Sequence, residues 1–116
     1  MPARSMTMPK LLAVCADDFG LSQAVSNGII ALAQARRVTA VSCMTNATLW
    51  KQAASALQQL PTSASIGLHI NLTDGQPVSR ELARIWPRLP ALPRLLALTH
   101  LGRTPVAAVQ REIEAQ

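Results

Sequence analysis

The feature that most constrains this chain is an alternation of short apolar runs with amphipathic helical patterns. Apolar, partly β-branched runs at residues 10–16, 38–44 and 64–71 predict three strands. Helical spacing at 23–37 and 49–60 predicts a helix in each gap. Strands joined by such helices form right-handed β-α-β units, so the sequence predicts an α/β fold with a parallel β-α-β-α-β sheet. The first run, which is apolar from residue 11 to residue 16, is expected to be a central strand buried on both faces.

The second part of the chain carries a weaker pattern. Residues 77–105 are rich in proline and lack a clear periodicity, which predicts an irregular segment of short helices and extended turns. Thr104 and Pro105 then predict the start of a last helix. The predicted apolar stripe of this helix is formed by Val106, Val109, Gln110 and Ile113.

The length of 116 residues predicts one domain, spanning 1–116. Three strands make an incomplete parallel sheet, and its uncovered edges are an association hazard. We therefore expect either a second copy that covers an edge, giving a homodimer, or a fragment of a longer protein.

The short apolar runs also bear on the compartment. The longest, at residues 11–16, is closed by Asp17 and Asp18 and is far below the about 18 residues that span a bilayer. It is also too short for a signal peptide, so no membrane partner and a cytoplasmic location are expected. Cys15 and Cys43 each lie in an apolar run, which predicts two buried, reduced thiols.

The formal net charge of +5 comes mainly from arginine, because Lys10 and Lys51 are the only lysines. A basic surface raises the hypothesis of nucleic-acid binding. The late arginines, however, are scattered among prolines and leucines, and the aromatic residues that stack bases are limited to Phe19, Trp50 and Trp86. A solvated basic face is therefore favoured over a nucleic-acid partner.

Polar side chains follow each of the three predicted strands. Asp17 and Asp18 come after the first, Thr45 and Asn46 follow the second, and His69, Asn71 and Thr73 lie at the end of the third. Ligands of parallel sheets bind at the carboxyl ends of the strands, so these side chains are expected to share one rim. Taken alone, a pair of aspartates also suits a helix cap, and a lone histidine suits a hydrogen-bonded core position. Together, carboxylate and imidazole are usual ligands of divalent metals.

Several ordered blocks of the sequence resemble one family, the YdjC-like carbohydrate deacetylases. The resemblance extends from residue 11 to residue 116. The blocks are ADDFGLS at 16–22, NGI at 27–29, VSCMTN at 41–46, GLHINLTDGQP at 67–77 and REIEAQ at 111–116.

The resemblance implies a (β/α) barrel-like fold, of which this chain would form the first half. It also implies hydrolysis of the N-acetyl group of an amino sugar or oligosaccharide with a divalent metal, Mg or Zn. By position, Asp17 matches the catalytic base, and Asp18 and His69 match metal ligands. Asn46 and Thr73 are expected to line the sugar pocket. The third protein ligand is expected beyond residue 116, so the short chain is expected to lack part of the site.

A rival hypothesis comes from the open sheet edge. It treats the chain as a non-catalytic α/β association module that pairs with itself. Metal-dependent release of acetate discriminates between the two hypotheses, because only the deacetylase predicts it.

Overall fold

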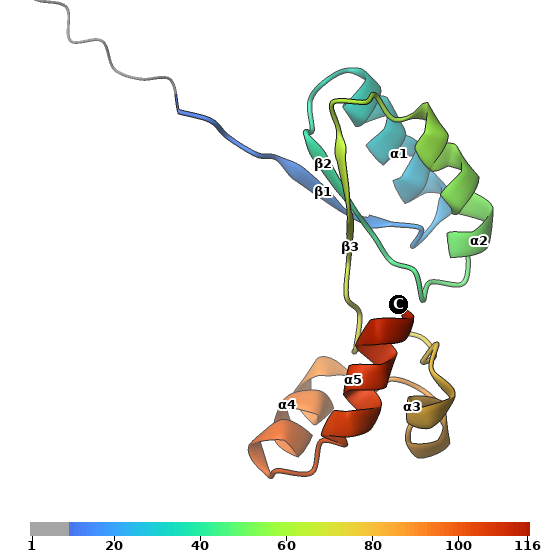
Figure 1. Cartoon of the computed structure of the whole chain (residues 1–116), viewed down its shortest axis with the longest axis vertical. Coiled ribbons are helices and arrows are strands. Elements are labelled where there is room, and N and C mark those ends of the chain that lie inside the picture. Colours follow the sequence, from blue (N-terminus) through green and yellow to red (C-terminus); the bar gives the residue numbers. More distant parts are fainter. Residues whose placement is uncertain (1–9) are drawn as a thin grey trace, which may run out of the picture.

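The computed structural model describes residues 10–116 and contains one parallel three-stranded sheet (Figure 1). The strands lie in the order β1-β2-β3, and both neighbouring pairs are parallel. The α/β fold with a parallel β-α-β-α-β sheet is therefore confirmed. The elements in chain order are β1 (Cys15–Phe19), α1 (Gln23–Gln34), β2 (Ala40–Cys43), α2 (Trp50–Ala53), the 3-10 helix η1 (Ala54–Gln59), β3 (Ser65–Leu68), α3 (Arg80–Ile85), α4 (Leu92–His100) and α5 (Val106–Ala115).

The prediction of a buried central first strand is wrong. The central strand is β2, and β1 is an edge strand that begins only at Cys15. Leu11 and Leu12 precede it and are 98% and 81% exposed. The physical reason is that β1 has a pairing partner on one side only, and no described element packs over the residues before it. Cys15 is accordingly exposed, against the prediction of two buried thiols, whereas Cys43 is buried as expected.

The first core lies between one face of the sheet and the helices α1, α2 and η1 (Figure 1). Ser22 caps α1, because its hydroxyl accepts a hydrogen bond from the Val25 amide at 3.2 Å. The helix predicted over 49–60 is present as α2 followed by η1. No described helix covers the opposite face of the sheet, which we call the open face. The buried core residues are Phe19, Ile29, Ile30, Val41, Cys43 and Ala53.

The helices α3, α4 and α5 lie beyond the carboxyl ends of the strands (Figure 1). Helices α3 and α4 occupy the proline-rich segment 77–105, and α3 begins where the Ser79 hydroxyl accepts a hydrogen bond from the Leu82 amide at 3.3 Å. A second, smaller core joins α3 to α5. Its buried residues are Leu82, Leu89 and Ala108.

The predicted apolar stripe of the last helix is confirmed at Val109, which packs against the small core, and is wrong at its other three positions. The residues of α5 that are buried are Ala108 and Glu112, whereas Val106 and Ile113 are 72% and 38% exposed. Ala108 faces the small core because α5 packs beside α3 at this position. Thr104 does not cap the helix either, since its hydroxyl pairs with the Thr99 hydroxyl at 2.9 Å and Pro105 occupies the N-cap position.

Among residues 10–116, no helix is long and apolar enough to cross a membrane.

Candidate functional site

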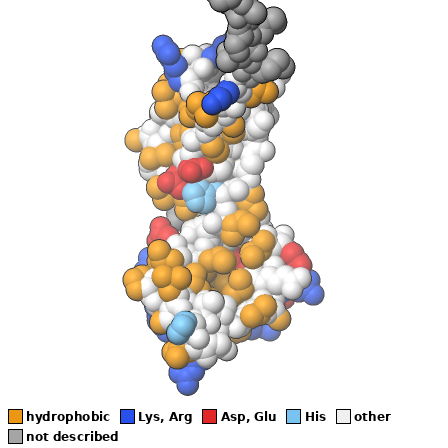
Figure 2. All heavy atoms as spheres, turned by 90° about the vertical axis from the view of Figure 1, so that its left-hand side faces the viewer, with side chains coloured by type: hydrophobic (Ala, Val, Ile, Leu, Met, Phe, Trp, Pro, Cys, Tyr) orange, Lys and Arg blue, Asp and Glu red, His pale blue; other side chains and the backbone are white. Residues whose placement is uncertain are grey.

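Three of the predicted site residues meet on the open face of the sheet. Asp18 and His69 are in direct contact, with 3.3 Å between Oδ1 and Nδ1. Ser42 joins Asp17 to this pair, because its hydroxyl donates to Asp17 Oδ1 at 2.6 Å and lies 3.2 Å from His69 Nδ1. Figure 2 shows acidic side chains against a histidine on an exposed face, between the sheet and the helices. The convergence of Asp17, Asp18 and His69 was predicted, but both aspartates lie within β1 and not after the first strand, because that strand begins later than expected. The bridging serine was not predicted.

A distortion of β1 brings both carboxylates to the open face. Neighbouring residues of a regular strand point to opposite faces, so one aspartate would face the core. Between Ala16 and Phe19 the register with β2 shifts, and Asp18 adopts a left-handed conformation with φ of 68°. Such a conformation is unfavourable for a residue other than glycine, and it is typical of functional positions. The bulge thereby places Asp18 beside His69 while Phe19 returns to the core.

The charge of Asp17 is stabilised by its neighbours. The hydroxyl of Ser42 is the main cause that lowers the pKa of Asp17, followed by the Cys15 thiol at 3.5 Å from Oδ1. Desolvation and the adjacent Asp17 carboxylate raise the pKa of Cys15, so the thiol stays protonated and acts as a donor. Asp17 is therefore a carboxylate at neutral pH with its Oδ1 atom fixed in place.

The arrangement of Asp18 and His69 fits two ligands of one metal ion. Donors that each lie about 2.0–2.2 Å from a tetrahedral ion are about 3.3–3.6 Å apart. The 3.3 Å between Asp18 Oδ1 and His69 Nδ1 matches this spacing, and both side chains are partly exposed. In this structure the same Nδ1 atom accepts a hydrogen bond from the Asp18 amide at 3.4 Å. Within residues 10–116 no group of three or more His, Cys, Asp or Glu side chains is placed to hold a metal. The described residues thus supply a pair of donors.

Asn46 and Thr73 belong to a second cluster, centred on the buried side chain of Asn71. Asn71 Nδ2 donates to Asn46 Oδ1 at 3.1 Å and to the Asp74 carbonyl at 2.9 Å. Its Oδ1 accepts from the amides of Thr73 and Asp74, both at 3.1 Å. Asn71 therefore fixes the turn after β3 and orients Asn46. No hydrogen bond among the described residues joins this cluster to the Asp18–His69 pair.

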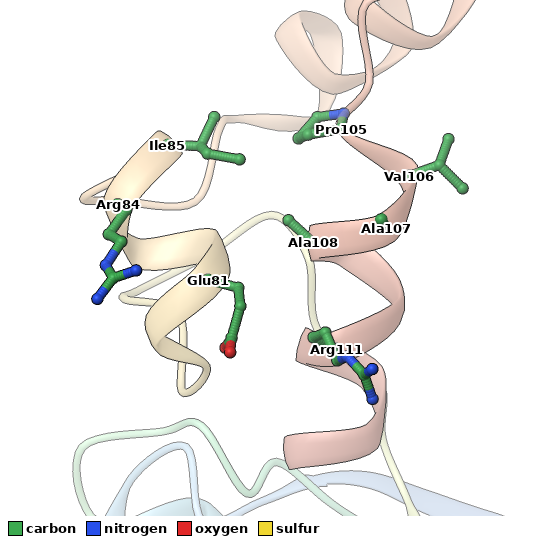
Figure 3. A pocket seen from close by; sticks show the side chains of 8 residues that line it. All are labelled: Glu81, Arg84, Ile85, Pro105, Val106, Ala107, Ala108 and Arg111. Carbon is green, nitrogen blue, oxygen red and sulfur yellow. The ribbon is translucent and has the colours of Figure 1, made fainter.

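Two adjoining cavities open beside the Asn71 cluster. The smaller, of about 260 Å³, is lined by Asn46, Asn71, Asp74 and Arg88, and it reaches Leu21, close to the end of β1. The larger, of about 620 Å³, shares Asn46 and Arg88 and adds Trp50 and Lys51. We call these two spaces the rim cavities. A third cavity, of about 640 Å³, lies between α3 and α5 and is lined by none of the predicted site residues (Figure 3).

Sequence reasoning missed several residues of this region as site residues. Ser42 lies within the sequence block 41–46, which is the signal that could have identified it. Asn71 was expected at the rim of the sheet, but no role at the site was predicted for it. Lys51 and Arg88 read as two of many scattered cations, and only the fold brings them to the same cavity. Nothing in the local sequence pairs them.

Comparison with known proteins places these observations in a family context. The family model for YdjC-like proteins matches residues 11–116. A chitooligosaccharide deacetylase of Enterobacter sp. (strain 638) is 31% identical over 116 residues, which cover 94% of this chain and 42% of the relative. A carbohydrate deacetylase of Danio rerio is 40% identical over 78 residues, covering 66% of this chain and 24% of the relative.

A solved structure also matches. It belongs to a protein of Enterococcus faecalis V583 named for cellobiose-phosphate cleavage, with 29% identity and a TM-score of 0.52. The match covers 60% of this chain and 28% of that one. The chain spans less than half of the length of the curated relatives described here.

Proposed function

The chain belongs to the YdjC-like protein family, and we propose that it contributes to the metal-dependent removal of an N-acetyl group from an amino sugar or oligosaccharide. The two relatives described above are named a chitooligosaccharide deacetylase and a carbohydrate deacetylase. The observation that carries the proposal is the contact of Asp18 with His69 at 3.3 Å on an open sheet face, with Asp17 held nearby by Ser42.

We assign Asp18 and His69 as ligands of a divalent metal, zinc or magnesium. Their atoms have the spacing of two donors to one ion, as described above. The metal would polarise the acetyl carbonyl and make bound water more acidic. This pair would supply two of the ligands of the ion, and the other ligands would come from groups outside the pair.

We assign Asp17 as the general base. Its Oδ1 atom is occupied by the Ser42 hydroxyl, and no hydrogen bond of the described residues uses Oδ2. Oδ2 accepts a proton from the attacking water as the water oxygen bonds to the acetyl carbon. The C–N bond then breaks as the proton held on Asp17 passes to the amine nitrogen, and acetate and the free amino sugar leave. Ser42 holds Asp17 in one orientation during this transfer.

The rim cavities are the proposed sugar site. Asn46 offers an amide to sugar hydroxyls, and Trp50 offers an apolar ring surface for a pyranose. Thr73, which was expected to line the sugar pocket, lines neither cavity and belongs to the turn that Asn71 holds. Lys51 and Arg88 line the same space and suit an anionic group on the sugar. The name of the Enterococcus protein includes such a group, a phosphate. The contribution of Lys51 and Arg88 is measured by comparing the binding affinities of a neutral and a phosphorylated disaccharide.

Calorimetric titration of zinc and magnesium into the chain tests the metal assignment. We expect binding that is lost in Asp18→Ala and in His69→Ala. His100→Ala is the matched control, because His100 is an exposed histidine on α4. Release of acetate from an N-acetylated chitooligosaccharide is measured next, with Asp17→Asn as the variant that keeps metal binding and loses turnover. Metal binding that survives both Asp18→Ala and His69→Ala would refute the proposed ligands.

A second candidate function follows from the edge of the sheet. β3 pairs with β2 on one side only, and its Ile66 and Leu68 side chains are 54% and 44% exposed. Such an edge favours pairing with a second copy, as an association module would. Sedimentation velocity over a hundredfold range of concentration tests it. A dimer without acetate release supports the association module, whereas a monomer that binds metal supports the deacetylase.

A further inference from the structure

Glu112 of α5 is a fully buried carboxylate, with 0% of its surface exposed. Its Oε1 atom accepts from the Val78 amide at 2.9 Å, and its Oε2 atom accepts from the Ser79 amide at 2.7 Å. No lysine or arginine within residues 10–116 forms an ion pair with it. Burying an unpaired carboxylate is costly unless directed donors compensate it. Position 112 therefore requires a side chain that accepts hydrogen bonds, and an apolar side chain would leave the Val78 and Ser79 amides without this acceptor.

Gln116 follows Glu112 by one helical turn, at the C-cap of α5, so both side chains lie on the same side of the helix. Its Nε2 atom donates to Glu112 Oε1 at 2.9 Å and to the Asn71 carbonyl at 2.7 Å. Its Oε1 atom accepts from the Asn71 amide at 2.9 Å. The side chain thus pairs with both backbone groups of Asn71, as a neighbouring strand would.

The two side chains hold opposite ends of one loop. Gln116 binds the loop that connects β3 to α3 at Asn71, and Glu112 binds it at Val78 and Ser79. Between these points lie Asp74 and Gly75, which line the rim cavities. In Figure 1 the carboxyl end of α5 lies next to the ends of the strands, and in Figure 3 the helix packs beside α3.

We propose that Glu112 and Gln116 are positioning residues that clamp the 71–79 loop and thereby set Asn71, Asn46 and the Asp74 carbonyl at the sugar site. The clamp acts on the substrate pocket and leaves the Asp18–His69 pair, which is on the sheet, in place. The substrate part of this inference rests on the proposed function. The mechanical part is independent of it, because it concerns only the loop and α5.

Amide hydrogen exchange measured by mass spectrometry tests the clamp on the whole chain. In Glu112→Gln, we expect exchange in residues 76–80 to become about tenfold faster, because one acceptor oxygen is replaced by an amide donor that faces other donors. In Gln116→Ala, we expect the same acceleration in residues 70–75. Exchange in β1 and β2 is expected to stay unchanged in both variants.

The matched controls lie on the exposed side of α5. Glu114→Gln removes a carboxylate that pairs with Arg111 at the surface, and Gln110→Ala removes an exposed glutamine. Both should leave the loop unchanged. If Glu112→Gln fails to fold, Gln116→Ala decides, because Gln116 is only partly buried. Exchange that rises uniformly over the chain, or that does not rise in the loop, would overturn the clamp.

Kinetics with an N-acetylated chitooligosaccharide separate positioning from catalysis. We expect Gln116→Ala to raise KM about three- to tenfold with kcat within about twofold, because metal and base are untouched. A fall in kcat with unchanged KM would contradict a role in the pocket. If the unsubstituted chain releases no acetate, the proposed function fails, and the exchange experiment still decides whether the clamp exists.

Discussion

The two halves of the molecule are held together in different ways. In the sheet unit, residues 15–69, six buried apolar side chains form one cluster between the sheet and its helices. In the helical unit, residues 71–116, the apolar cluster has three members, and α4 contributes no buried residue. The most buried side chain of α5 is a carboxylate, Glu112. Apolar burial shapes the first half, whereas directed hydrogen bonds position the second.

This difference matches a division of labour at the proposed site. The proposed metal ligands and base lie on the sheet unit, where burial of Phe19 and Val41 fixes the strand ends. The proposed sugar contacts come from both units, because Asn46, Trp50 and Lys51 belong to the sheet unit and Arg88 belongs to the helical unit. Chemistry is thus assigned to the sheet unit alone, whereas the sugar site also depends on the few polar contacts that hold the 71–79 loop.

The largest expected effect is a loss of core volume in the sheet unit. Phe19 is fully buried, so Phe19→Ala is expected to lower the free energy of unfolding by about 3–5 kcal/mol, through lost burial and the cavity left behind. Urea-induced unfolding followed by circular dichroism measures it. Phe19→Leu, which keeps most of the volume, should lose much less. A loss below about 1 kcal/mol for Phe19→Ala would mean that apolar burial in the first core is not what stabilises the sheet unit.

The next effect concerns Glu112 and is dependent on pH. Burial acts to raise its pKa, but hydrogen bonds from Gln116 and from the amides of Val78 and Ser79 outweigh it, so the pKa of Glu112 is lowered in the folded chain. A lowered folded pKa stabilises the fold above the ordinary glutamate pKa of about 4.3, and this contribution is lost as pH falls through the folded value. Glu112→Gln is expected to cost about 1–3 kcal/mol at pH 7.

The control for this prediction is the same measurement at acidic pH. As pH falls through the folded pKa of Glu112, the difference between Glu112→Gln and the unsubstituted chain should shrink, because the carboxyl group becomes protonated in both states. Glu114→Gln should show little difference at either pH, since Glu114 forms only an exposed pair with Arg111. A penalty for Glu112→Gln that does not change with pH would exclude a role for the charge.

A smaller effect is expected on the open face of the sheet. Ser42→Ala removes the hydrogen bond that contributes most to the lowered pKa of Asp17, so that pKa should rise toward its ordinary value. The carboxyl resonance of Asp17, followed by NMR over pH 2–7, reports it. Ser65→Ala is the control, because Ser65 is an exposed serine of β3 with no hydrogen bond to Asp17. An unchanged titration in Ser42→Ala would remove Ser42 from the proposed mechanism.

The sheet unit was largely predictable from the sequence, because period and β-branching report local structure directly. The strands at β2 and β3 and the helix α1 were expected close to where they lie. The position of β1 was not, since an apolar run such as residues 10–16 indicates burial without saying what buries it. Pairing with Ala40 begins only at Cys15, and the leucines before it remain exposed.

The site was predictable in part. Convergence of Asp17, Asp18 and His69 follows from the parallel topology, because carboxyl ends of parallel strands share one edge. The bulge that turns Asp18 toward His69 is a tertiary distortion without a sequence signal in a single chain. The burial of Glu112 was equally hidden, because helical periodicity assigns apolar residues to the core and places Glu112 outside.

The smallest change in the free energy of unfolding is expected for a substitution on α4. It is compared with the same substitution at a buried leucine of α3. Leu96 is 60% exposed on a helix with no buried residue, so Leu96→Ala should change the free energy of unfolding by less than about 0.5 kcal/mol. Leu82→Ala, the same substitution at a fully buried position of α3, should cost about 2–5 kcal/mol. Both are measured by urea unfolding at low and high protein concentration. A cost above about 1 kcal/mol for Leu96→Ala that grows with concentration would show that α4 is covered by a second copy in solution, and the helical unit would then be held by apolar burial as well.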